Sequence, residues 1–306
     1  MFPACHDDLT DRQLAESPAM AAMPAWTHSL RRYPLVGWDV VGFGLDCEVV
    51  ASMNDGLAGL VLAAGAGRRL APLTRVRPKA LCPVGGRPLV LLALQRLTPC
   101  TGDLAVNLHH GAAALDAVLP ADIHRSVEQP VALGTAGALG ALRPWLDGRA
   151  VLVTNADSWL PSTLDLKRFV EGWDGDRVRL LCVDDPARGD FGSLRYCGVA
   201  LMPWSQVAPL AAEPSGLYEV SWRHEAAAGR LDLVTHGGAF VDCGTPADYL
   251  RANLLASGGE SVVSRGAEIG LGVRVERSVV WDNSRVEAGE VLVDAIRAEH
   301  LTVLVR

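Results

Sequence analysis

A glycine turn followed by a run of cations is the feature of this sequence best suited to chemistry. The apolar run from Gly59 to Ala64 is typical of a short buried strand. Gly65 and Gly67 follow it, and glycine lets a backbone turn tightly and approach a ligand closely. Exposed amides beside uncompensated cations favour an anion such as a polyphosphate. The next five charged residues are all cations, namely Arg68, Arg69, Arg75, Arg77 and Lys79.

The spacing excludes two common phosphate-binding motifs. No G-K-[ST] sequence closes the turn, as a P-loop requires, and Leu70 stands where a dinucleotide fingerprint needs its third glycine. On these features alone, a solvated arginine-rich surface is as good an interpretation as a phosphate site. Lysine usage adds to the phosphate interpretation, because only two lysines occur, Lys79 and Lys167. A retained lysine indicates a need for a compact ammonium, whereas Lys167 is interpreted as a surface residue of a helix.

The segment from Leu62 to Leu89 resembles the signature of the sugar-1-phosphate nucleotidyltransferases, L-A-A-G-x-G-x-R-L-x-P-L-T-x-x-x-P-K-x-L-x-P-V-x-G-x-P-L. This family includes mannose-1-phosphate guanylyltransferases and glucose-1-phosphate thymidylyltransferases. The resemblance covers nearly all of residues 57–256 and implies a Rossmann-like nucleotidyltransferase domain. Its further segments are VNLHHGAAALDAVL (106–119), EQPVALGTAGAL (128–139), VTNADSW (153–159) and GGAFVDCGTPADYLRANL (237–254).

The reaction that the resemblance implies joins a sugar 1-phosphate to the α-phosphorus of a nucleoside triphosphate and expels pyrophosphate. Because the attacking phosphate is already an anion, catalysis needs charge neutralisation and in-line positioning rather than a nucleophilic side chain. The sequence agrees, since it offers no convincing Ser-His-Asp or Cys-His arrangement. The resemblance implies that Arg69 grips the departing phosphates and that Lys79 neutralises the developing charge. It also implies that the triphosphate lies on the turn formed by Ala64, Gly65, Gly67 and Arg68.

Two aspartates match the residues that hold a divalent metal in this family. Asp157 closes the sequence NAD, and Asp242 lies in FVDCGTP. Mg²⁺ commonly takes one or two carboxylates together with substrate phosphates. The resemblance therefore implies a magnesium cofactor held by both aspartates, with Asp157 also a catalytic residue. Taken alone, Asp157 could cap a helix and Asp242 could belong to a turn.

The EQPVALGTAGAL segment contacts the base and ribose in similar enzymes, so we expect Glu128, Gly134 and Thr135 in the nucleotide site. A glutamate can accept hydrogen bonds from both donors of guanine, whereas uracil offers one, so Glu128 favours GTP over UTP. The alternative is that Glu128 is a solvated residue at the end of a strand. Many similar enzymes bind the sugar phosphate through a lysine, but residues 180–194 contain none. The candidate substitutes are Arg188 and Arg195.

Two other functions compete with this one. A catalytically silent regulatory homologue that binds NDP-sugar would usually lose a charged residue of the site, but Arg69, Lys79, Asp157 and Asp242 are all present. A nucleotidyltransferase for a non-sugar phosphate acceptor is opposed by the GTAG and DCGTP segments. We therefore favour an enzyme that makes an NDP-sugar from a nucleoside triphosphate and a sugar 1-phosphate.

Composition limits the remaining possibilities. The 306 residues carry a formal net charge of −7, which argues against a general nucleic-acid surface. The seven cysteines are scattered, odd in number and without a C-x-x-C pair, which indicates free thiols. No apolar run approaches the ~20 residues of a membrane span, and the acidic start lacks a signal-peptide core. We expect a cytoplasmic protein without membrane partners that could form a homo-oligomer.

Apolar runs alternate with helical segments along the chain. This alternation predicts an α/β fold with a doubly wound, mostly parallel sheet, whose ligands lie beyond the carboxyl ends of the strands. The glycine turn and Asp157 both follow expected strands. Strands are expected at 58–64, 103–108, 123–128, 150–155 and 177–183, and helices at 88–97, 111–119, 135–146 and 163–172, the last capped by Ser162 or Thr163.

Three parts of the chain are expected. Residues 1–56 show no clear period and are interpreted as a poorly ordered extension, an upstream start codon, or an accessory segment. Residues 57–256 are expected to form the catalytic domain, and residues 257–306 a short left-handed β-helix-like segment. So short a coil cannot bury its own core, so we expect it to pack on the main domain or on another subunit. The six-residue period is carried by Val263, Ile269, Val275 and Trp281.

Overall fold

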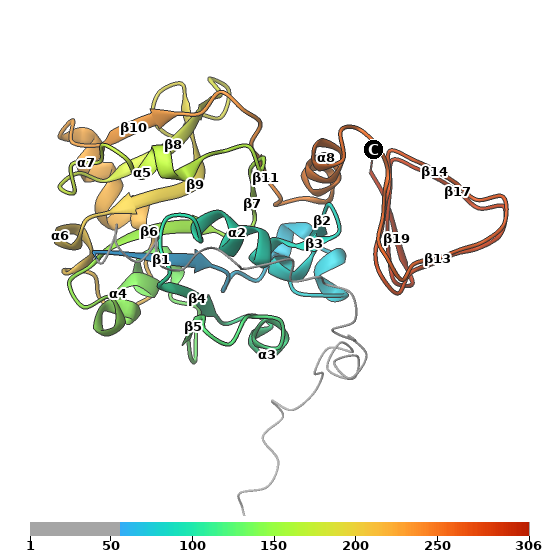
Figure 1. Cartoon of the computed structure of the whole chain (residues 1–306), viewed down its shortest axis with the longest axis horizontal. Coiled ribbons are helices and arrows are strands. Elements are labelled where there is room, and N and C mark those ends of the chain that lie inside the picture. The colour runs from blue at the N-terminus through green and yellow to red at the C-terminus, as the bar shows by residue number, and fades with distance from the viewer. Residues whose placement is uncertain (1–55, 306) are drawn as a thin grey trace, which may run out of the picture.

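The computed structural model describes residues 56–305, so the expectations for residues 1–55 lie outside the described part of the chain. A seven-stranded sheet with the order β10-β8-β9-β6-β1-β4-β5 forms the centre of the molecule (Figure 1). All neighbours in this sheet are parallel except β9, which runs antiparallel to both β6 and β8. The strands are β1 (Leu57–Leu62), β4 (Leu104–Leu108), β5 (His124–Val127), β6 (Ala150–Asn155), β8 (Arg179–Asp184), β9 (Leu194–Met202) and β10 (Asp232–Thr235).

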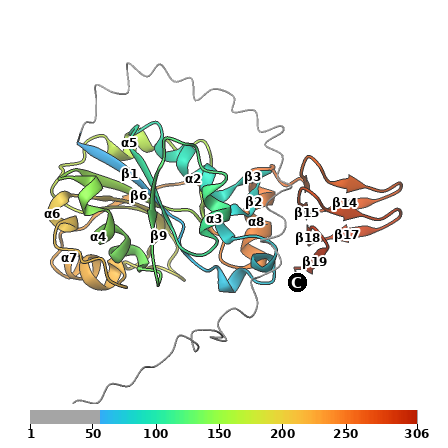
Figure 2. The ribbon, with the colours of Figure 1, turned by 90° about the horizontal axis from the view of Figure 1, so that it is seen from below.

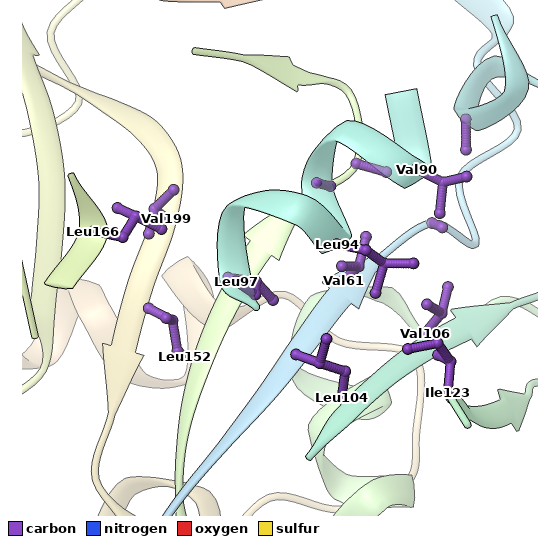
Figure 3. Packing of buried hydrophobic residues seen from close by; sticks show 14 of the residues in the cluster. Val61, Val90, Leu94, Leu97, Leu104, Val106, Ile123, Leu152, Leu166 and Val199 are labelled. Carbon is purple, nitrogen blue, oxygen red and sulfur yellow. The ribbon is translucent and has the colours of Figure 1, made fainter. Parts of the chain in front are cut away.

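Helices cover both faces of the sheet, which confirms the doubly wound α/β architecture. Strand β1 is buried on both faces, because Val61 packs into one core cluster and Leu60 into the other. Figure 3 shows the first cluster, in which Leu94 and Leu97 lie near Val61 and Leu104. This cluster is covered by α2 (Leu89–Leu97), α3 (Ala112–Asp116) and α5 (Leu166–Val170). The other is covered by α4 (Gly134–Leu146), α6 (Trp204–Val207) and the π-helix η7 (Tyr218–Trp222), which continues into α7 (Arg223–Ala227).

Helix α5 begins later than expected, and its predicted cap was wrong. Its cap is Asp165, whose carboxylate accepts a hydrogen bond of 3.0 Å from the backbone N–H of Lys167. Ser162 and Thr163 lie in the turn before it. An aspartate two residues before a free N–H satisfies that donor directly, so it outcompetes the earlier hydroxyls. Every helix within residues 56–305 is too short or too polar to cross a bilayer.

The C-terminal strands form a three-sided coil that lies beyond α8 (Pro246–Ala256) at one end of the domain (Figure 2). Parallel strands stack at intervals of 17 residues, so that Val263 pairs with Val280. A 17-residue coil is one residue short of three hexapeptides. Trp281 therefore leaves the expected stack, and Val280 takes its place. The strands are β12 (Val262–Val263), β13 (Glu268–Ile269), β14 (Arg274–Glu276), β15 (Val279–Val280), β16 (Arg285–Val286), β17 (Val291–Val293), β18 (Ala295–Ala298) and β19 (Leu301–Leu304).

Trp281 joins the coil to the part of the chain that carries the seven-stranded sheet. Its side chain is completely buried in a cluster that also contains Leu70, Leu73 and Tyr249. The indole Nε1–H donates a 2.9 Å hydrogen bond to the hydroxyl of Tyr249, which in turn donates to the backbone oxygen of Pro83. The coil therefore shares one hydrophobic core with α8 and with the segment that follows the glycine turn.

We predict that Trp281→Ala lowers the free energy of unfolding by about 3–5 kcal/mol, because it opens a cavity in this shared core. Urea denaturation measures the change. Val263→Ala is the control, since Val263 is 45% exposed and its truncation should cost less than about 1 kcal/mol. Equal losses in the two variants would contradict the assignment of Trp281 as the anchor of the coil.

Candidate active site

The glycine turn after β1 contacts the segment that carries Lys79. Gly67 has φ 62°, a conformation that favours glycine. A Cβ at Gly67 would lie only 2.7 Å from the Cβ of Lys79, so a larger residue would push the two segments apart. Gly65 has no such neighbour within 4 Å and a negative φ, so space alone does not require glycine there. Gly67 is therefore the glycine on which the packing of this turn depends.

Four of the predicted site residues form one charged cluster. The Lys79 ammonium contacts the carboxylate of Asp157, and its Nζ lies 3.9 Å from Oδ1 of Asp242. Arg69 Nη2 lies 3.4 Å from Oδ2 of Asp242. The side chain of Lys79 is only 10% exposed, that of Arg69 is 72% exposed, and both aspartates are about one-third exposed. The cluster therefore has a buried ammonium at its base and an open side lined by Arg69.

Pairing between two short strands brings the aspartates together. Strand β7 (Ser158–Trp159) runs antiparallel to β11 (Val241–Asp242), with Asp242 opposite Ser158. The backbone N–H of Cys243 also donates a 3.0 Å hydrogen bond to the backbone oxygen of Asp157. The side-chain caps of the neighbouring helices α5 and α8 are Asp165 and Thr245. The carboxylates of Asp157 and Asp242 are thus not used as helix caps.

Arg96 supports the turn that presents Asp157, and sequence reasoning missed it. Arg96 lies on α2, and its guanidinium donates a hydrogen bond of 2.9 Å to the hydroxyl of Thr154 and another of 2.8 Å to the backbone oxygen of Ser158. Burial lowers the pKa of Arg96 to about 10, which still leaves the group charged at neutral pH. The available signal was an arginine within the largely apolar helix LVLLALQRL.

Glu128 lies inside the protein, contrary to both sequence interpretations. It is 2% exposed, and one of its carboxylate oxygens accepts a 2.7 Å hydrogen bond from the side-chain amide of Asn107. The other oxygen accepts a 2.7 Å hydrogen bond from the backbone N–H of Leu133. The side-chain oxygen of Asn107 in turn accepts a 2.7 Å hydrogen bond from the backbone N–H of Ala63. Because the carboxylate is buried and both of its oxygens already accept hydrogen bonds within the protein, the structure does not support the argument for GTP, which needs an open carboxylate at Glu128. The network instead ties the glycine turn to the loop before α4.

Gly134 and Thr135 begin α4 and also have partners within the protein. Gly134 has φ 71°, and a Cβ there would lie 2.5 Å from the backbone oxygen of Ser215. The hydroxyl of Thr135 accepts a 2.8 Å hydrogen bond from the N–H of Leu217. The glycine is therefore explained by packing against the 215–217 segment, independently of any ligand.

Arg188 and Arg195 lie apart from the Lys79 cluster, around a cavity of about 400 Å³. Both approach Asp185, at 3.2 Å and 3.5 Å. The guanidinium of Arg195 lies 5.0 Å above the ring of Phe240, which also lines the cavity. The structure brings these two arginines together but shows no contact between them and Lys79 or either aspartate of the cluster.

The cysteines of the described chain are not nucleophiles. All five are buried, and Cys82, Cys182, Cys197 and Cys243 are free, which fits the expectation of free thiols for these positions. Burial raises the pKa of Cys82 to about 12 and also raises that of Cys243, next to Asp242, so these thiols are protonated at neutral pH. Neither thiol therefore adds a nucleophile to the charged cluster.

A glycine turn, a buried lysine and paired aspartates at the carboxyl edge of a parallel sheet indicate an enzyme that transfers nucleotidyl groups. Residues 59–236 match the model of the MobA-like NTP transferase domain, and the chain belongs to this family.

Several relatives are named as sugar-1-phosphate nucleotidyltransferases, and another is named as the molybdenum cofactor guanylyltransferase of Cupriavidus pinatubonensis. The chain is 30% identical over 228 residues to the N-acetylmuramate α-1-phosphate uridylyltransferase of Caulobacter vibrioides, covering 63% of this chain and 94% of that protein. It is 26% identical to the mannose-1-phosphate guanylyltransferase of Mycobacterium tuberculosis, covering 76% and 82% of the two chains. A solved structure from Thermus thermophilus, described as a mannose-1-phosphate geranyltransferase, shares the fold with a TM-score of 0.61, 18% identity and coverage of 82% and 95%.

We predict that Glu128→Gln lowers the free energy of unfolding by about 1–3 kcal/mol, because an amide cannot accept from both Asn107 and Leu133. Thermal or urea unfolding measures the effect. Glu171→Gln, at an exposed position, is the matched control and should leave stability nearly unchanged. A Glu128 variant as stable as this control would show that the network contributes nothing.

Proposed function

We propose that this protein joins a sugar 1-phosphate to a nucleoside triphosphate, releasing pyrophosphate and an NDP-sugar. The observation that carries the proposal is the position of the Lys79 ammonium between the carboxylates of Asp157 and Asp242, beside the glycine turn. Arg69 lines the open side of the same cluster. The proposed catalytic domain is residues 57–256, with residues 257–306 as its C-terminal coil.

The proposed role of the cations is to neutralise phosphate charge. Lys79 and Arg69 would bind the triphosphate, whose oxygens would also accept from the amides of residues 64–68. In-line attack by a phosphate oxygen on the α-phosphorus forms one P–O bond and breaks the bond to pyrophosphate, with no proton transfer required. A buried ammonium that is aimed at this charge before the reaction needs little reorganisation, which is the basis of electrostatic catalysis.

The two aspartates fit a magnesium ion. They supply only oxygen ligands, which is what Mg²⁺ prefers, and the family is commonly Mg²⁺-dependent. Among the described residues there is no group of three or more His, Cys, Asp or Glu side chains that could hold a metal alone. Asp157 and Asp242 would therefore hold the ion together with substrate phosphates, and the bound ion would supply positive charge to the phosphates.

The proposal covers UTP and GTP, the nucleotides implied by the names of the two relatives, and both N-acetylmuramate 1-phosphate and mannose 1-phosphate as acceptors. Pyrophosphate release from a matrix of these nucleotides and sugar phosphates tests it. A catalytically silent protein would give no release with any pair. A non-sugar phosphate acceptor, the other alternative, would be indicated by release only when such an acceptor replaces the sugar.

Lys79→Ala should lower kcat by ~10²-fold or more, since a contact that strengthens in the transition state is lost. Steady-state pyrophosphate release measures this loss. The other lysine of the chain gives a matched control, because Lys167 is exposed and Lys167→Ala should leave kcat unchanged. Activity of the Lys79 variant within a few-fold of the parent would refute its assigned role.

Asp157→Asn and Asp242→Asn should each lower activity nearly as much as the double variant, because one metal would bridge both carboxylates. Raising the Mg²⁺ concentration should partly restore each single variant, and EDTA should abolish the parent activity. Asp165→Asn is the control, since asparagine can also cap a helix. Additive losses, or parent activity that survives EDTA, would argue against a shared metal site.

A further inference from the structure

We propose that the C-terminal coil positions Lys79 for catalysis through an ion pair between Arg77 and Asp282. This proposal rests on the proposed function and adds Arg77 and Asp282 to it as positioning residues, which act through the backbone of Lys79 rather than on the substrate. Arg77 lies two residues before Lys79, and Asp282 lies in the coil, 205 residues away in sequence.

The pair has the geometry of a strong interaction. Arg77 Nη1 lies 3.0 Å from one carboxylate oxygen of Asp282, and Nη2 lies 3.3 Å from the other. Glu299, also in the coil, approaches Nη2 at 3.8 Å. The side chain of Arg77 is only 8% exposed, and its guanidinium lies 4.6 Å above the ring of Trp281. The two parallel N–H···O contacts and the aromatic face together fix the direction of Arg77.

The chain between Arg77 and Lys79 leaves little freedom to absorb a displacement. Pro78 has a fixed φ, and it is held on its other side by the turn before α3. A Cβ at Gly111 in that turn would lie 2.3 Å from Cγ of Pro78, so the backbone of Gly111 lies close against the Pro78 ring. Gly67 contacts Lys79 itself. A shift of Arg77 would therefore be passed to the Lys79 backbone and to the ammonium between the aspartates.

The coil has other interactions that hold it together without Arg77. Val280, Val286 and Leu292 form its interior. A second two-pronged ion pair, between Arg277 and Asp294, has contacts of 2.7 Å and 2.6 Å, and both partners belong to the coil. Arg277–Asp294 is exposed and Arg77–Asp282 is largely buried. The chain thus contains two arginine–aspartate ion pairs of the same kind. Only one of these two, Arg77–Asp282, connects the coil to the segment that carries Lys79.

The test compares Asp282→Asn with Asp294→Asn. Asp294 has φ 48°, which asparagine tolerates, so its variant should fold normally. We expect Asp282→Asn to lower kcat about tenfold or more at an almost unchanged KM for the nucleotide, since small misplacement of a catalytic group is costly. Asp282→Glu should recover part of the loss. Asp294→Asn should leave kcat unchanged.

Hydrogen exchange provides a readout that does not depend on activity. The N–H groups of Leu81 and Cys82 are bonded to the backbone oxygens of Pro78 and Lys79. They should exchange faster in Asp282→Asn and at the parent rate in Asp294→Asn. Should Asp282→Asn fail to fold, Arg77→Lys tests the same contact, because lysine keeps the charge and loses the fork.

Unchanged kcat per folded molecule together with unchanged exchange in Asp282→Asn or Arg77→Lys would overturn the proposal. Equal losses in the Asp282 and Asp294 variants would also overturn it, since they would indicate general weakening of the coil. A parent protein that releases no pyrophosphate would refute the proposed function instead. In that case the exchange rates still decide whether the coil holds the Lys79 segment.

Discussion

The structure of the site depends on one interaction, the contact of the Lys79 ammonium with two carboxylates. Asp157 directly precedes β7 and Asp242 ends β11, and these two strands pair. Like charges held this close repel each other unless a cation lies between them. Lys79 and Arg69 balance the two negative charges. The ammonium is nearly buried, where charges interact more strongly than in water. The surrounding packing must therefore hold the Lys79 ammonium in place.

The segment that carries Lys79 is held from behind by apolar packing. Leu70 and Leu73 are completely buried against Tyr249 of α8 and Trp281 of the coil. Charged and apolar residues alternate along this segment, so that Arg69 and Lys79 point to the site while their neighbours anchor the backbone. The backbone hydrogen bonds of this segment close only single short turns, so its order also depends on these packing contacts.

Much of this could be predicted from sequence, but only where the information is local. The glycine turn and Lys79 lie within one contiguous motif, and alternating apolar runs were enough for the parallel sheet. Strands β9 and β10 were not among the expected strands. The antiparallel direction of β9 could not be predicted in any case, because a burial pattern does not encode strand direction. The burial of Glu128 could not be predicted either, since its donors come from Asn107 and Leu133, which only the folded chain brings beside it.

Trp281 also differs from its predicted position, and the difference comes from a coil that is one residue shorter than expected. In an 18-residue coil its side chain would stack inside the coil, where the interior positions are filled by valine and leucine. The 17-residue interval instead turns it outward into the core beneath Lys79. The Asn107–Glu128 network holds the glycine turn on the other side of the site. Buried polar groups favour a single arrangement only when each has a partner. The hydrogen bonds of Trp281 and Glu128 meet that condition, so each side of the site is tied to one arrangement by residues outside the charged cluster.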